Sequence, residues 1–324
     1  MRTLTTIGCA LVMVVIGGLG HSAAQDAKAA EVLAKTRQAL GGLAIERLKT
    51  LSIDASMQRN LAQMQMSSDV ELLLEMPDKY VRRETSRGGT NMTMSSGFNG
   101  GKAILPAGAS MTAPGTMVIR MGPGGPMPGD APKLTDEQKA EINATSLRAA
   151  RAELSRMMLG WLGMAHPALG AQYTYAGVAQ SPDGKAHVID VRDGDGFEAR
   201  LFIDQNNYLP LMVTYKGRQP RMVTSRMPAG APAGAAQNTA QARQLSDEER
   251  KKLQEETEAR IKREMGDQPL VEFSMFFDDW REVDGLQFPH VMRRGSGGET
   301  TEEWTINKVT VNPRIDAKQF EVDR

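Results

Sequence analysis

Alternation of apolar and polar residues runs through most of the chain and predicts an antiparallel β protein. In Leu51–Arg59 every second residue from Leu51 to Met57 is apolar and those between are polar. This is the period-two pattern of a strand with one apolar face. Similar patterns predict strands at residues 64–75, 80–85, 91–98, 102–105, 173–178, 187–191, 197–203, 210–216 and 271–278.

The most distinct strand pattern lies near the C-terminus. Asp284-Gly285 separates two apolar runs, and this dipeptide favours a two-residue hairpin because both of its residues accept positive φ. A second turn at Gly295–Gly298 leads to a strand at Glu299–Val311. We therefore expect a three-stranded meander, in which Pro289 occupies an edge position or a bulge because it lacks an amide donor.

Three segments have helical patterns. Asp26–Leu40 is amphipathic and ends at Gly41-Gly42. Thr135 and Gln138 form a capping box that starts a helix continuing to about Gly160. The third helix, Asp247–Met265, is charged nearly all round, which is typical of a lightly docked, solvent-exposed helix.

These elements indicate the α+β class. Strand follows strand without an intervening helix, which argues against a parallel α/β sheet. One large, strongly curved antiparallel sheet with a few helices fits the order best.

The N-terminus has the features of a secretory signal peptide. Arg2 precedes an apolar run from Ile7 to Leu19 that is too short to cross a membrane, and small residues follow it up to Ala24. We expect residues 1–24 to be removed after export, most simply to the periplasm, leaving 324 − 24 = 300 residues and no transmembrane segment. Because Cys9 is the single cysteine, the mature chain has no thiol for disulfides or catalysis.

Residues 25–324 are expected to form one domain carrying two inserts. Residues 106–133 are dominated by Gly, Pro, Ala and Met without a sustained period, which predicts a mobile or disordered segment. Residues 227–266 combine a similar low-complexity stretch with the charged helix.

Charge and motif content exclude several classes of function. Lys plus Arg and Asp plus Glu number 39 each, so there is no basic surplus that would indicate nucleic-acid binding. His166, His187 and His290 lie in separate predicted elements, and structural roles suit them better than catalysis. No nucleophile–base spacing and no metal-ligand pair is present, so we expect neither an enzyme, nor a metal site, nor a cofactor.

Methionine is unusually abundant, with 21 residues. Met92-x-Met94 places two thioethers on one face of a strand, which suits Cu(I) but lacks a locally spaced third ligand. Methionine also fills irregular apolar space adaptably, and a cavity lined with it accepts acyl chains of variable shape. Apolar residues on both phases of some strands permit either ordinary core packing or a ligand groove. The residues that we predict to line a cavity are Met57, Leu72, Leu74, Met92, Met94, Phe273, Met275 and Trp304.

Short motifs along the chain resemble the outer-membrane lipoprotein-sorting (LolA/LolB-like) family. They are Leu40-Gly41-Gly42, Met76-Pro77-Asp78-Lys79-Tyr80, Phe98-Asn99-Gly100, Ile203-Asp204 with Leu209-Pro210, Asp279–Pro289, and Asn312-Pro313-x-Ile315-Asp316 with Phe320. The resemblance implies an unclosed β-barrel with helices in or over its concave side, and a cavity for lipoprotein acyl chains or other hydrophobic ligands. The two inserts depart from the family pattern, and no position matches a ligand-gating arginine.

We therefore predict a periplasmic carrier or binding protein for a lipid, lipoprotein acyl chains or another hydrophobic ligand. The alternative is an envelope sensor that uses the same scaffold to bind a partner protein through the charged helix and the inserts. A third possibility, an envelope hydrolase, would need a histidine and a carboxylate to converge in one pocket.

Overall fold

The computed structural model describes residues 22–61, 64–87, 92–105, 109–113, 116–119, 135–182, 184–218 and 269–321. The chain divides into two compact units. The first comprises Met1–Leu105, Leu147–Gly217 and Val271–Arg324, and the second comprises Pro106–Ser146 and Arg218–Leu270. The predicted charged helix and most of the predicted signal peptide lie outside the described residues.

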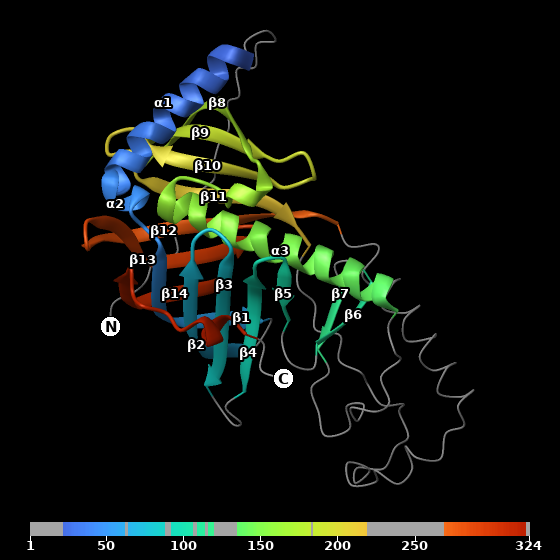
Figure 1. Ribbon diagram of the computed structural model, residues 1–324. Helices are drawn as coiled ribbons and strands as arrows, with labels where there is room; N and C mark the ends of the chain where they lie inside the picture. The colour runs from blue at the N-terminus through green and yellow to red at the C-terminus, as the bar shows by residue number, and fades with distance from the viewer. Residues whose placement is uncertain are drawn as a thin grey trace, which may run out of the picture. The chain divides into compact units, whose positions relative to one another are not determined.

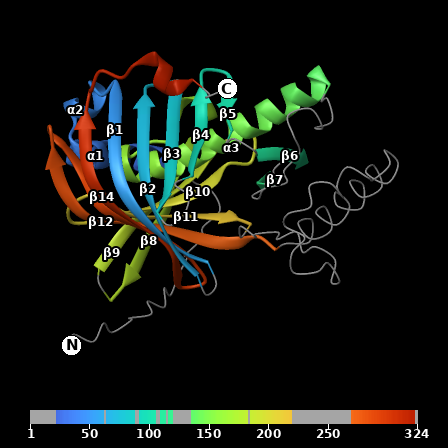
Figure 2. The same cartoon turned by 90° about the horizontal axis from the view of Figure 1, so that it is seen from below.

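One antiparallel sheet of twelve strands forms the first unit, in the order β5-β4-β3-β2-β1-β14-β13-β12-β11-β10-β9-β8 (Figures 1 and 2). Its edges are β5 and β8, and these strands do not pair with each other among the described residues, so the sheet is open. The predicted α+β class and unclosed barrel are confirmed. The strands are β1 (Thr50–Leu61), β2 (Met64–Glu75), β3 (Lys79–Arg87), β4 (Thr93–Asn99), β5 (Lys102–Ile104), β8 (Gln172–Ser181), β9 (Gly184–Arg192), β10 (Glu198–Asp204), β11 (Pro210–Gly217), β12 (Val271–Val283), β13 (Leu286–Ser296) and β14 (Glu299–Val311).

The second unit contributes a two-stranded hairpin, β6 (Ala109–Ala113) with β7 (Thr116–Ile119). It also contains the first residues of α3 (Asp136–Leu162). The predicted capping box is present there, because the amide of Gln138 donates to Thr135 Oγ1 over 3.2 Å and the amide of Thr135 donates to Gln138 Oε1 over 2.9 Å.

The strand order explains why a helix lies across the sheet. The chain leaves the sheet at β5 and re-enters it at the opposite edge, at β8, so the connection must pass over one face. Within the first unit α3 makes this passage on the concave face (Figure 2). Arg151 donates to the carbonyl of Gly100 at the β4–β5 turn, and Arg148 pairs with Asp193 at the β9–β10 turn. The helix thus links strands from both ends of the open sheet.

Two further segments cover the sheet. Helix α1 (Ser22–Leu40), followed by the short α2 (Leu43–Glu46), packs on β8 and β13 and buries Val32, Leu33 and Leu40. On the convex face the 3₁₀ turn η4 (Ala317–Phe320) buries Phe320 against side chains of β2, β3 and β5. A second 3₁₀ turn, η1 (Pro167–Leu169), precedes β8.

The Asp284-Gly285 turn has the predicted conformation. Asp284 and Gly285 have φ of 51° and 82°, and Val283 pairs with Leu286 across the two-residue loop. Pro289 lies in β13 and among the described residues pairs there only with Trp280 of β12, so it has the local edge position that was expected. The described ladder between β13 and β14 begins only at Val291, so the missing amide of Pro289 interrupts no pair there.

Candidate functional site

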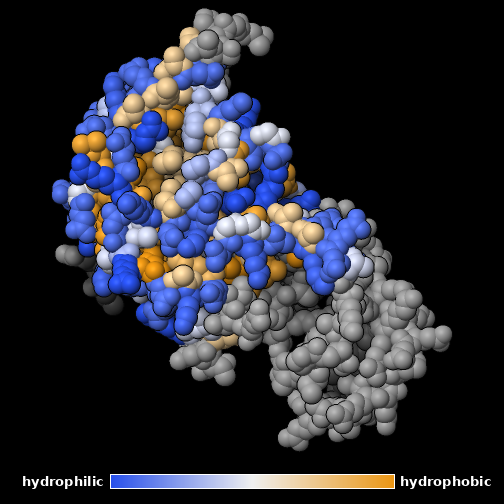
Figure 3. Space-filling view, viewed as in Figure 1, coloured by the Kyte–Doolittle hydropathy of each residue, from blue (hydrophilic) through white to orange (hydrophobic). Residues whose placement is uncertain are grey.

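The concave face of the sheet and the C-terminal part of α3 enclose the main apolar core. From Leu154 to Leu162 every residue of α3 except Arg156 is buried, whereas its N-terminal turns are exposed. A helical segment that is buried all round must have apolar neighbours on every side. In Figure 3, which shows the molecule from the α3 side, apolar atoms are visible between hydrophilic ones beside the helices.

Close contacts fix the last turns of α3 against β12 and β13. A Cβ added to Gly160 would lie 2.0 Å from Cζ of Phe277, so only glycine permits this approach. The indole Nε1 of Trp161 lies 3.1 Å from Sδ of Met292, and its ring centroid lies 5.3 Å from that of Phe288. The helix is therefore seated directly on the strands at this end.

Methionine is prominent in the layer between helix and sheet. Met57, Met275 and Met292 from the strands and Met157 and Met158 from α3 are each at most 3% exposed. Their unbranched side chains change shape easily. This layer can therefore repack around another apolar body more readily than a core of branched side chains.

Six of the eight residues that we predicted to line a cavity lie in this main core. Met57, Leu72, Leu74, Phe273, Met275 and Trp304 are each at most 6% exposed and belong to one apolar cluster. Met92 precedes β4 and is 40% exposed, while Met94 is half-buried and outside the cluster. The structure thus gathers six of these residues on one face, and their role in binding stays a prediction.

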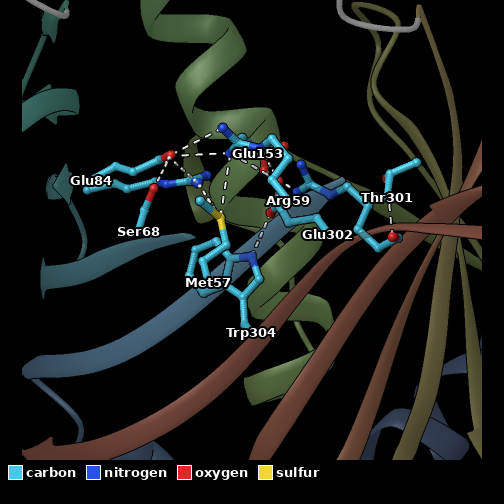
Figure 4. Close-up of polar contacts among 10 residues, drawn as sticks. Met57, Arg59, Ser68, Glu84, Glu153, Thr301, Glu302 and Trp304 are labelled. Carbon is cyan, nitrogen blue, oxygen red and sulfur yellow. Dashed lines mark hydrogen bonds and ion pairs between the residues drawn. The ribbon is translucent and has the colours of Figure 1, made fainter. Parts of the chain in front are cut away.

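A cluster of charged side chains interrupts the apolar layer at one place. We call it the charged cluster, and it comprises Arg59, Arg82, Glu84, Glu153, Arg156, Arg294 and Glu302, from β1, β3, β13, β14 and α3. Figure 4 labels Arg59, Glu84, Glu153 and Glu302 of this cluster. Each of these side chains is at most 27% exposed.

Within the charged cluster, Arg59 connects two carboxylates of different strands. Its guanidinium lies 3.1 Å from Glu84 and 3.1 Å from Glu302. Glu84 also accepts from Arg82 over 2.9 Å and from the hydroxyl of Ser68 over 3.3 Å. These bonds satisfy the two strand carboxylates without any group from α3.

Glu302 is further held by Trp304, whose indole nitrogen donates to it over 2.5 Å. The guanidinium of Arg82 stacks over the Trp304 ring, 4.7 Å from its centroid. Trp304, which we predicted to line a cavity, thus contacts the charged cluster with both its indole nitrogen and its ring.

Glu153 is the carboxylate that α3 adds to the charged cluster. It forms an ion pair with Arg294 of β13 and lies 3.3 Å from Arg156. Burial alone would raise the pKa of Glu153, but Arg294 and then Arg156 outweigh it and lower that pKa to about 2. For the same reason the pKa of Glu302 is lowered and that of Arg294 is raised.

Several buried polar atoms near these charges lack a partner among the described residues. They are Nε of Arg156, Nε of Arg294 and the hydroxyl of Tyr80. Burial raises the pKa of the Tyr80 hydroxyl. The charges of Arg82 and Arg294 oppose this increase, and the charge of Glu153 adds to it. Buried donors without an acceptor are costly and rare in folded proteins, so they point to a site with a further role.

The charged cluster was missed in the sequence, although a signal for it exists. Arg59 continues the inward phase of Leu51 to Met57, and Glu302 is in phase with Trp304. A charge on the apolar phase of a strand, repeated on several strands, indicates a buried polar site.

The three histidines lie apart from the charged cluster. His166 is buried and contacts the carbonyl of Pro77 over 2.6 Å, His187 contacts Tyr175 over 3.0 Å, and His290 contacts the carbonyl of Phe288 over 3.0 Å. Within the described residues none of them bonds to a carboxylate, and no group of three or more metal-ligating side chains gathers there. In the same part of the chain no helix is both long and apolar enough to cross a membrane.

Solved structures align with most of this chain at low sequence identity. A LolA superfamily protein from Nitrosomonas europaea aligns with a TM-score of 0.46 and 8% identity over 90% of this chain and 97% of its own. An outer-membrane lipoprotein-sorting protein domain from Vibrio parahaemolyticus aligns with a TM-score of 0.44 and 10% identity, over 91% and 97%.

A DUF1329 family protein from Desulfovibrio piger aligns with a TM-score of 0.39 and 10% identity, over 92% and 97% of the two chains. No family model and no curated protein matches the chain.

Proposed function

We propose that this protein binds a hydrophobic ligand, such as a lipid or acyl chain, on the concave face of its sheet and carries it in the periplasm after removal of residues 1–24. The observation that supports this most is the occupied concave face. There the buried end of α3, a single helical segment, covers an apolar layer rich in methionine.

Displacement of part of α3 would expose a continuous apolar surface. Met57, Leu72 and Met275, from three strands, all face this layer. An acyl chain that replaces the helix side chains keeps this surface away from water, which is the main driving force for binding. The ion pair of Glu153 with Arg294 ties α3 to β13, a strand at the centre of the sheet.

The proposal is tested by measuring lipid content and uptake. Native mass spectrometry of protein purified from its own envelope without detergent should show a bound lipid, and a fluorescent fatty acid should bind to the delipidated protein. Absence of both would contradict the proposal. If deletion of residues 227–265 then abolished capture of a protein partner, the sensor alternative would be favoured.

Adjacent leucines of β2 offer a matched pair of variants. Leu72 belongs to the concave-face core and Leu73 to the convex-face cluster with Phe320, and both are at most 5% exposed. Leu72→Ala should weaken fatty-acid binding by roughly tenfold. The substitution removes about three carbon atoms from the binding surface, each worth ~0.8 kcal/mol when fully buried, and only part of this contribution is lost from binding. Leu73→Ala should destabilise the protein similarly yet leave the affinity unchanged. Equal effects of the two variants on affinity would argue against a concave-face site.

A further inference from the structure

The strands contribute unequal numbers of positive and negative side chains to the charged cluster. The strands bring three arginines, Arg59, Arg82 and Arg294, and two glutamates, Glu84 and Glu302. Arg59 and Arg82 are paired with these two glutamates. The strands by themselves thus carry one more positive than negative charge at this place, and α3, which adds both Glu153 and Arg156, leaves this difference unchanged.

Arg294 is the arginine that depends on the helix. Among the described residues its one ion pair is with Glu153 of α3. Its side chain is only 19% exposed, so it would be costly to leave without an anion. Glu302, opposite Arg294 in the β13–β14 ladder, would remain as a negative neighbour, but Arg294 would lose its ion-pair partner unless a ligand that takes the place of this part of α3 supplies an anion.

A buried donor of Arg294 itself and the hydroxyl of Tyr80, on which the charge of Arg294 acts, also suit an anion. Nε of Arg294 and the hydroxyl of Tyr80 are buried and have no acceptor within the described part of the chain. The Glu153 carboxylate leaves these two donors without an acceptor. The carboxylate or phosphate group of a ligand offers several lone pairs that can accept from them. Tyr80 lies two residues before Arg82 on the same face of β3, at the border between the charged cluster and the apolar core.

We infer that the ligand is an amphiphile with an anionic group, a carboxylate or phosphate on a hydrocarbon chain, and that this group binds Arg294 at the position now occupied by the Glu153 carboxylate. The inference rests on the proposed function. It assigns the hydrocarbon chain to the methionine-rich layer and the anion to Arg294. Glu153 is then an internal mimic of the ligand, which keeps Arg294 neutralised when no ligand is bound.

A comparison of hexadecanoate with its uncharged methyl ester tests this assignment on the full chain. We expect the acid to bind about tenfold or more tightly than the ester, because a charge-assisted bond in a partly buried site is strong. Glu153→Gln should retain or increase this preference, since it removes the competing carboxylate. The double variant Glu153→Gln with Arg294→Gln should bind acid and ester equally.

The ratio of the affinity for the acid to the affinity for the ester distinguishes recognition of the anion from a change in the docking of α3. A variant that merely loosens α3 changes binding of the acid and the ester alike. Arg293→Gln is the matched control, because Arg293 directly precedes Arg294 in β13, is exposed, and pairs with Asp278. This variant should keep the preference of the unaltered protein.

Four results would decide against the assignment. Equal binding of acid and ester by the unaltered protein would overturn this inference alone, as would a preference that persists in the double variant. Binding of neither compound would overturn the proposed function and this inference with it. Hexadecyl phosphate and inorganic phosphate form a further pair, and saturation by inorganic phosphate alone at the same concentration would show that a free anion is the ligand.

Discussion

Charged side chains on the inward phase of the strands set this concave face apart from an ordinary packed core. Arg59, Arg82, Arg294 and Glu302 each lie two residues along their strand from a buried residue of the main core, which is Met57, Tyr80, Met292 and Trp304 respectively. These side chains stay charged because each has an ion partner. Burial alone would raise the pKa of Glu302, but the neighbouring arginines outweigh it and lower that pKa. At the residue scale, the proposed recognition of an anion depends on where these few charges lie.

Gly160 provides a prediction in which packing and helix propensity oppose each other. Alanine normally stabilises a helix by about 1 kcal/mol relative to glycine. Here its Cβ would lie within 2.0 Å of the Phe277 ring, so we expect Gly160→Ala to destabilise the protein by about 1–3 kcal/mol through overpacking. The urea midpoint of unfolding measures this change. Gly194→Ala, whose Cβ would meet nothing within 4 Å, should shift the midpoint far less.

A second residue-scale prediction concerns the turn between β12 and β13. Gly285 has φ of 82°, and a Cβ there would meet only Cβ of Ala44, at 3.6 Å. The cost of Gly285→Ala is therefore conformational, about 1–2 kcal/mol, and not steric. Asp284→Asn should be nearly neutral, because asparagine tolerates positive φ well. Similar midpoints for Gly285→Ala and Asp284→Asn would contradict this account of the turn.

Sequence patterns predicted some residues well and others poorly, for identifiable reasons. The Asp284-Gly285 turn and the Thr135–Gln138 capping box depend on local backbone chemistry, and both are confirmed. The charged cluster depends on residues up to 243 positions apart, such as Arg59 and Glu302, which only strand pairing brings together. Pro289 has a described ladder partner on one side only, as its missing amide predicts, although β13 as a whole is an interior strand, which the proline alone does not reveal.

Helix α3 is the element that connects fold and proposed function. Its N-terminal turns are exposed, its middle carries Glu153 and Arg156, and its last turns are buried against Phe277 and Met292. Its extent was predicted closely from the capping box and the apolar residues. Its position across the sheet follows from β5 and β8 being opposite edges, which no local pattern reveals.

Acid should weaken the attachment of α3 to the sheet. The pKa of Glu153 is about 2 in the folded protein, below the usual 4.5 of an unfolded glutamate. The ion pair therefore contributes fully to stability above pH 4.5, and this contribution is lost as the pH falls from about 4.5 to about 2. Urea midpoints measured across this range should fall less steeply in Glu153→Gln than in the unaltered protein. Parallel curves would show that Glu153 does not contribute.

At the scale of the whole molecule, the first and last strands of the sheet lie together at its centre. β1 pairs with both β2 and β14, and Asn312 fixes this junction by accepting from the amide of Lys49 over 2.7 Å. The strands of the middle of the sequence consequently form the two edges, β5 and β8, which remain open. An open sheet with a separate helix over its concave face permits that face to exchange its occupant.

The alternating pattern was sufficient to predict the α+β class and a single curved sheet, but not the strand order. Antiparallel neighbours along the chain are specified by short turns, whereas the pairing of β1 with β14 joins residues such as Leu51 and Val311. Both strands have one apolar face and would suit several partners. Long-range pairing of this kind is selected by the whole core, and therefore lies beyond local patterns.

Binding on the concave face can be tested most directly at Trp304, which lies in the core beside the charged cluster. The chain has three tryptophans, and replacing Trp161 and Trp280 by phenylalanine leaves Trp304 as the single reporter. A fatty acid brominated along its chain should quench the fluorescence of Trp304 in a saturable manner, whereas the unbrominated acid should not. Saturable binding of the brominated acid without quenching of Trp304 would place the ligand elsewhere and contradict the proposed site.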